Sequence, residues 1–237
     1  MSSQVDSARV RVGTLRVRRP AVPALSFVIL VAVLNSALNG VVAAVGSALP
    51  ALLQFEYTVA VPLGPGGAAL LAVGSGVLAV CSLTLFVLSV DGAGPASLSP
   101  SEVLRRFGRA TVVAVAGVLA TVLGLAVLVV PGLVVLAYLP YVFVAVVVDG
   151  QTVSGAIRTS HDRIVARPGP VAATALGTVG VLLALALGGV LTSLFPPTVE
   201  FVAGGTASAL VVLAGTYLLT GLYRRAGSRH THTAGQL

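Results

Sequence analysis

Residues 110–148 read ATVVAVAGVLATVLGLAVLVVPGLVVLAYLPYVFVAVVV, a run of 39 residues without a charged side chain. A helix needs about 20 apolar residues to cross the hydrocarbon core of a bilayer, so this run is too long for one crossing and long enough for two. Near its middle, Val129 and Val130 are followed by Pro131 and Gly132. Proline lacks the amide hydrogen that a continuing helix requires, and glycine tolerates the positive φ of a tight reversal. We therefore expect two helices that meet at Pro131 and Gly132.

Four further charge-free runs, at residues 20–55, 57–90, 168–199 and 201–223, are each long enough for one crossing. The whole chain is 57% hydrophobic and 9% charged, whereas soluble domains carry roughly 25% charged residues. This composition excludes a soluble enzyme, and it excludes a disordered chain, which needs low hydrophobicity. The sequence predicts an all-α, polytopic transmembrane bundle over residues 23–223, with six spans near 25–48, 66–90, 110–130, 132–148, 171–194 and 200–222.

The basic residues test this span count independently. All 14 are arginines, and they fall in the N-terminal segment 1–22, in two connections and in the tail 224–237. The connections on the opposite side of the membrane contain no basic residue, and their only charged residues are Glu56 and Glu200. Because arginine-rich segments stay on the cytoplasmic side, six spans place both termini in the cytoplasm. We expect a multi-pass protein of the cell membrane whose arginines meet anionic lipids, and no nucleic-acid partner, although the net charge is +7.

A cleavable signal peptide is the alternative interpretation of the N-terminus. Arg18 and Arg19 precede an apolar run, and small residues lie near Ser47 and Ala48. That run is longer than the usual signal core of about 7–15 residues. We therefore expect an uncleaved first span.

Two connections on the cytoplasmic side have the pattern of short amphipathic helices. Residues 99–102, Ser-Pro-Ser-Glu, form a capping-box sequence with proline at the first helical position. Residues 152–165 alternate apolar and charged side chains in a similar way. Both are expected to lie on the inner leaflet. With the basic N-terminal segment, they leave open whether the chain is three copies of a basic segment followed by a helical hairpin.

Few polar side chains lie inside the predicted spans, and none of them is Asp, Glu, Arg or His near a span centre. Such residues mark proton relays and ion-coupled transport, so those functions are disfavoured. Asn35 and Asn39 are four residues apart and share a helix face, where they serve helix packing or contact a solute. Pro140, between Tyr138 and Tyr141, frees a backbone carbonyl and bends its helix or lines a cavity.

The sequence offers little catalytic chemistry. It has no nucleophile elbow and no lysine for a phosphate-binding loop. His161 and Asp162 are neighbours on a helix and point in different directions, whereas acid–base catalysis needs a convergent pair. His230 and His232 offer two ligands, and structural zinc needs four. The single cysteine, Cys81, cannot form an internal disulfide. We expect no enzyme activity, no cofactor and no metal.

Residues 124–160 are the most distinctive part of the chain. They combine an apolar helix ending at Pro131-Gly132, a second ending at Asp149, and Arg158-Thr-Ser160 in the helix that follows. This pattern resembles six-span membrane proteins related to the membrane domain of glycerophosphodiester phosphodiesterases. The resemblance covers about 40 residues, and His161 stands where an aromatic residue often follows the serine.

This resemblance implies structural roles for Pro131, Gly132, Asp149, Arg158 and Ser160, and no chemistry, because the phosphodiesterase activity of that family belongs to a separate soluble domain. On physical grounds, Asp149 can cap the next helix and Arg158 can reach lipid phosphates.

Together these patterns favour a non-enzymatic accessory protein that binds a lipid or a membrane partner, including a second copy of itself. The alternative is a transporter or permease subunit for a neutral or amphiphilic molecule. That alternative would use Asn35, Asn39, Tyr138 and Pro140.

Overall fold

The computed structural model describes residues 20–46, 59–92, 98–127, 129–166 and 196–227, with isolated positions 180, 187 and 194. Within these ranges the chain is helical and contains no strand, which confirms the all-α expectation. The helices are α1 (Ala21–Gly46), α2 (Pro65–Asp91), α3 (Pro100–Val127), α4 (Val129–Asp149), α5 (Val153–Ala166) and α7 (Pro197–Gly227).

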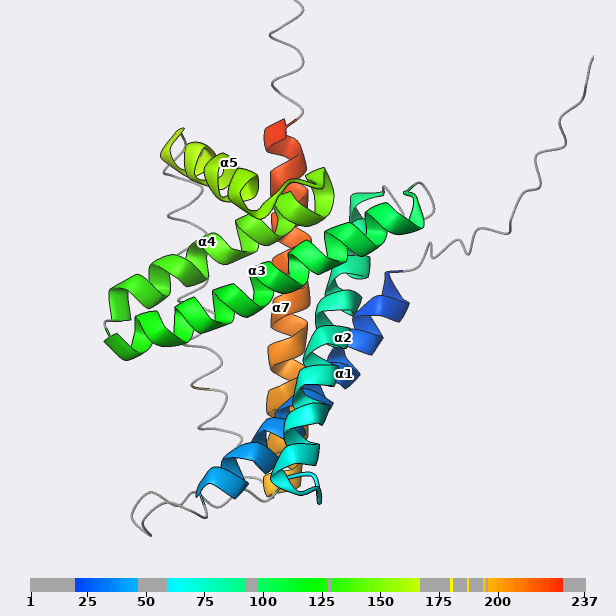
Figure 1. The fold of residues 1–237 in the computed structure, drawn as a ribbon, viewed down its shortest axis with the longest axis vertical. Coiled ribbons are helices and arrows are strands. Elements are labelled where there is room, and N and C mark those ends of the chain that lie inside the picture. Colours follow the sequence, from blue (N-terminus) through cyan, green and yellow to red (C-terminus); the bar gives the residue numbers. More distant parts are fainter. Residues whose placement is uncertain are drawn as a thin grey trace, which may run out of the picture.

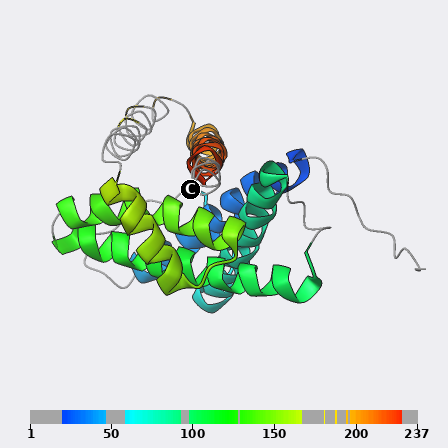
Figure 2. The ribbon, with the colours of Figure 1, turned by 90° about the horizontal axis from the view of Figure 1, so that it is seen from above.

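α2 and α7 stand nearly upright in Figure 1, and α1 packs chiefly against α2 and is inclined to α7. The antiparallel hairpin of α3 and α4 crosses them obliquely and extends to one side, as the view from above shows (Figure 2). α5 turns away from α4 through 120° and lies across one end of the molecule. The same end holds the last turn of α2, the first turn of α3 and the last turn of α7 (Figure 1). We call it the arginine-bearing end, because Arg105, Arg106, Arg109 and Arg158 all lie on these helices.

Three described helices are long and apolar enough to cross a membrane: Ala21–Val45, Pro65–Asp91 and Thr198–Gly221. A fourth crossing is added if Tyr138–Asp149 and Val153–Asp162 form one bent span. The chain therefore has the helices of a polytopic membrane protein, while the predicted count of six is not reached in the described ranges. The fifth predicted span, 171–194, falls almost wholly outside the described residues.

The two helices of the long apolar run divide earlier than the sequence predicts. α3 ends at Val127 and α4 begins at Val129, so Pro131 and Gly132 are the third and fourth residues of α4. The reason is that the first amides of a helix have no intrahelical acceptor, so a proline in the first turn costs no hydrogen bond. The two-helix expectation is confirmed, and the predicted position of the turn is wrong.

Two apolar clusters hold the helices together. One joins α1, α2 and α7 through Phe27, Phe86 and Leu213, with the small residues Ala79 and Ala209 between them. The other surrounds the last turns of α4, where residues 142–147 are all buried. A helix that is apolar on every side needs cover on every side, and the end of α4 has it. The residues that supply this cover are Val87 and Leu88 of α2, Ala110 of α3 and Leu219 of α7.

The outer surface of the bundle is apolar. Large exposed side chains occur on each long helix, among them Leu25, Leu70, Leu123 and Leu218. Exposed apolar side chains in this number are unfavourable in water, and they are the ordinary covering of a helix bundle in lipid. The composition of the chain and its described surface therefore agree on a membrane-embedded protein.

Candidate functional site at the arginine-bearing end

Two arginines of α3 hold the end of α4. Arg106 Nη1 donates to the carbonyl oxygens of Val147 at 2.8 Å and Val148 at 2.7 Å. Arg109 Nη1 donates to the carbonyl of Gly150 at 2.7 Å. The last carbonyls of a helix lack intrahelical donors and carry partial negative charge, so a guanidinium there satisfies both needs. We call this arrangement the arginine clamp: Arg106 on the last carbonyls of α4 and Arg109 on the carbonyl of Gly150 directly after it.

Glu102, one turn earlier in α3, orients the clamp. Its carboxylate accepts from Arg106 Nε at 3.0 Å and forms a second ion pair with Arg105. The hydrogen bond from Arg106, followed by that from Arg105, lowers the pKa of Glu102 from its ordinary value of 4.5. Arg106 is mostly buried, with 12% of its side chain exposed, whereas Arg105 is 59% exposed. Arg106 is therefore a structural group, and Arg105 is presented outward.

The start of α3 is capped as the sequence predicts. Ser99 Oγ accepts from the amide of Glu102 at 3.2 Å, which is the serine half of the predicted capping box. The reciprocal half would use the carboxylate of Glu102, but that carboxylate binds the two arginines instead.

Gly150 allows the chain to turn from α4 into α5. Its φ is +65°, in the left-handed region that favours glycine. A Cβ built on it would lie 3.1 Å from Arg106 Cζ and 3.1 Å from Glu102 Oε1. A side chain at position 150 would therefore adopt a strained backbone conformation and would also require Arg106 and Glu102 to shift slightly, so both conditions favour glycine.

The predicted cap of α5 by Asp149 is wrong. Thr152 caps this helix, because its Oγ1 accepts from the amide of Gly155 at 3.2 Å. Asp149 is the last residue of α4, and its Oδ2 accepts from Gln151 Nε2 at 3.3 Å and from the hydroxyl of Tyr223 on α7. The cap position belongs to the residue directly before the helix, and α5 begins at Val153, too late for Asp149.

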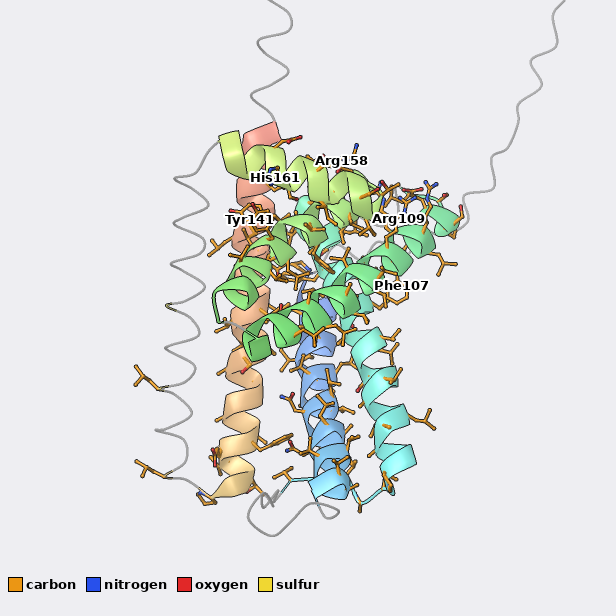
Figure 3. The ribbon with its side chains drawn as sticks, turned by 60° about the vertical axis from the view of Figure 1, so that its left-hand side comes forward. Phe107, Arg109, Tyr141, Arg158 and His161 are labelled. Carbon is orange, nitrogen blue, oxygen red and sulfur yellow. The ribbon has the colours of Figure 1, made fainter. Side chains whose placement is uncertain are left out.

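α5 has a buried face and an exposed face (Figure 3). Ala156 and Ser160 are buried one turn apart, and Ser160 Oγ has no hydrogen-bond partner among the described residues. Ile157 is 50% exposed, and Arg158 and His161 are exposed as well. Of the residues that the family resemblance singled out here, Ser160 is therefore a core position and Arg158 a surface position.

The two predicted intramembrane amides each face a neighbouring segment of the chain. Asn39 Nδ2 donates to the carbonyl of Val59, before α2, at 3.2 Å. Asn35 Nδ2 lies 3.6 Å from the position that a Cβ on Gly205 of α7 would take. Each amide is thus directed at a neighbouring segment of the bundle.

The candidate residues of α4 are spread along that helix. Tyr138 and Pro140 are half-buried in its middle, and Gly132 is buried near its start. The structure does not bring these residues together with Arg158 and Ser160 in one site.

Several key residues were not singled out from the sequence. Arg106 and Arg109 could have been suspected, because Glu102 and Arg106 are four residues apart, a spacing that pairs charges on a helix. Gly150 follows a helix end and has the pattern of a C-terminal glycine cap. Tyr223 gave no such signal, because its partner Asp149 is 74 residues away.

Several of the charged groups described at this end of the molecule are engaged with one another. The carboxylate of Glu102 and the two clamp arginines are engaged with one another or with backbone carbonyls. Within the described ranges, no group of three or more His, Cys, Asp or Glu side chains is placed to hold a metal ion. No protein-family model, curated protein or solved structure matches the chain, so the resemblance to the phosphodiesterase-associated membrane proteins stays a prediction.

Proposed function

We propose that this chain is a non-enzymatic integral membrane protein that binds a lipid or a membrane partner at its arginine-bearing end. In this proposal it crosses the cell membrane six times, and both termini and the arginine-bearing end face the cytoplasm. The arginine distribution along the chain supports that orientation. The gathering of α3, α5 and the end of α7 at one end of the molecule supports it as well.

One observation supports the binding role: some charged side chains at this end are bound within the protein, whereas others are exposed on α5. Arg106, Arg109 and Asp149 bind other parts of the chain and fix the junction of α4 and α5. The exposed face of α5, with Arg158 and His161, is held in place by that junction and faces outward. An exposed helix face that is positioned by a hydrogen-bonded junction is the arrangement expected of a binding surface.

The transport alternative has less support. It relied on Asn35 and Asn39 as solute contacts, yet the amide of Asn39 is bonded to Val59 and Asn35 faces Gly205. Amides that are engaged between helices stabilise the bundle, as in other membrane proteins.

The test is native mass spectrometry of the protein after gentle extraction from its own membrane. A stoichiometric partner protein, a second copy of the chain, or a retained lipid would support the binding role, and its mass would identify which. Retention of none of the three would contradict the proposal. Uptake of a neutral solute by vesicles that contain only this protein, abolished in Asn35→Leu/Asn39→Leu, would establish the transport alternative instead.

A further inference from the structure

Two exposed apolar side chains at the arginine-bearing end are each followed directly by an exposed arginine. On α3 the pair is Leu104, 69% exposed, and Arg105, whose side chain is 59% exposed. On α5 the pair is Ile157 and Arg158. An isolated exposed leucine needs no explanation, but two such pairs on separate helices at one end of a membrane protein do.

A contact with α7 shows how close these pairs lie to the end of a membrane-crossing segment. The crossing segment of α7 ends at Gly221, and Tyr223, two residues later, donates to Asp149. Two residues of helix rise about 3 Å, so the junction of α4 and α5 lies close to the end of that crossing. The clamp brings Arg106 to the same level, and with it the neighbouring pair on α3.

The orientation of α5 suits this level. It turns away from α4 through 120° and runs across the end of the bundle (Figure 3). Its buried face, with Ala156 and Ser160, is turned inward, and Ile157 and Arg158 are on the exposed side of the helix. A helix in this position, with an apolar and a basic side chain exposed together, has the character of an interfacial helix.

The charges favour an anionic surface. Arg105 shares Glu102 in a largely exposed ion pair, which contributes little and can exchange for a phosphate. Glu102 is held chiefly by Arg106, so its charge remains compensated when Arg105 turns outward. Arginine binds phosphate oxygens through a planar fork of donors, and each arginine near an anionic membrane improves binding by a factor of about five.

We propose that the Leu104-Arg105 and Ile157-Arg158 pairs are lipid contacts, in which the apolar side chain enters the acyl region and the arginine binds the phosphate of an anionic phospholipid. This inference deepens the proposed function and rests on it, since it assigns the ligand of the arginine-bearing end. The selected ligand is an anionic glycerophospholipid of the surrounding leaflet, because the charged side chain of each pair is an exposed arginine.

Tryptophan fluorescence tests this directly, because the chain contains no tryptophan. Full-length Ile157→Trp is reconstituted in vesicles of phosphatidylcholine and phosphatidylglycerol, in which only one of the two lipids carries bromine on its acyl chains. We expect brominated phosphatidylglycerol to quench the fluorescence of the Ile157→Trp variant more strongly than the same mole fraction of brominated phosphatidylcholine. Arg158→Gln in the Ile157→Trp background should remove this preference, and Arg158→Lys should retain most of it.

Val202→Trp on α7, at a position 62% exposed in the crossing segment, is the control. It should be quenched equally by both lipids, which reports correct insertion. With that control intact, absence of quenching at position 157 would overturn the inference by placing α5 in water. Equal quenching by both lipids there would overturn the assignment of an anionic ligand. Absence of quenching in Val202→Trp would instead contradict the membrane-embedded fold on which the proposed function depends.

Discussion

At the scale of single residues, Gly150 bears the tightest constraint at the arginine-bearing end. It has a positive φ, and the guanidinium carbon of Arg106 lies 3.1 Å from the position that a Cβ on Gly150 would take. Gly92, at the end of α2, has a similar φ of +76° with nothing near the position of a Cβ. A substitution at either glycine strains the backbone, but only a substitution at Gly150 also crowds the arginine clamp.

Gly150→Ala is expected to destabilise the protein more than Gly92→Ala. Both substitutions lose about 1–2 kcal/mol to a left-handed alanine. Gly150→Ala also displaces Arg106 and weakens its bonds to the end of α4, at a cost of about 1–3 kcal/mol. Thermal unfolding of the two variants in the same detergent measures the difference. Equal losses of stability in the two variants would show that Arg106 can shift without any loss of folding free energy.

Glu102 gives the arginine-bearing end a pH dependence. Its pKa is lowered in the folded protein by the hydrogen bonds from Arg106 and Arg105, so unfolding raises it toward 4.5. The stabilisation is fully present above that value and is lost as the pH falls through the folded pKa. We expect the difference in unfolding temperature between wild type and Glu102→Gln to be constant above pH 4.5 and to shrink below it. A difference that grows on acidification would have the wrong sign.

At the scale of elements, the α3–α4 hairpin depends on one close approach. A Cβ on Gly117 would lie 2.7 Å from Leu139 Cδ2 and 2.9 Å from Leu139 Cγ. The absence of a side chain at Gly117 thus lets Leu139 of α4 pack against the backbone of α3. Small residues serve this purpose between helices in lipid, where apolar side chains gain nothing by leaving the lipid.

Gly117→Ala is expected to destabilise the hairpin by about 1–3 kcal/mol, because Leu139 must move out of its place. Gly74→Ala on α2 is the matched control, since nothing lies near the position of its Cβ. The control should be neutral or slightly stabilising. In a double-mutant cycle, Leu139→Ala should cost less in the Gly117→Ala background than in wild type. Strict additivity would refute the contact.

At the scale of the whole molecule, Tyr223 and Asp149 connect α7 to the end of α4. The arginine clamp connects α3 to the same place, so three helices meet at the junction that mounts α5. The hairpin itself projects to the side (Figure 2), and its closed end is far from this junction. The junction is therefore where the oblique hairpin is tied to the upright helices.

Tyr223→Phe should lower the stability by about 1.5–3 kcal/mol, the usual contribution of a hydrogen bond to a charged group. Tyr217→Phe, on the same helix and 57% exposed, should change the stability by less than about 0.5 kcal/mol. Hydrogen exchange measured by mass spectrometry should show faster exchange in α5 for Tyr223→Phe alone. Unchanged exchange in α5 would mean that the α7 contact does not hold the junction.

The family resemblance pointed to Asp149, Arg158 and Ser160 as structural positions. The structure gives Asp149 a different task from the expected cap, and it buries Ser160 while exposing Arg158. Their types were visible in the sequence, but their partners were not.

The sequence by itself determined the all-helical fold of the described residues, the apolar surface and the placing of arginines in alternate connections, because these follow from residue type and short-range spacing. The cap at Ser99 and the existence of two helices in residues 110–148 belong to the same class. Only the tertiary structure decided the clamp, the Tyr223–Asp149 contact and the oblique placing of the hairpin. The residues joined by the clamp are 41 or more apart in the sequence, and Tyr223 and Asp149 are 74 apart. Contacts at that separation depend on how whole helices pack, and no local pattern of residues encodes them.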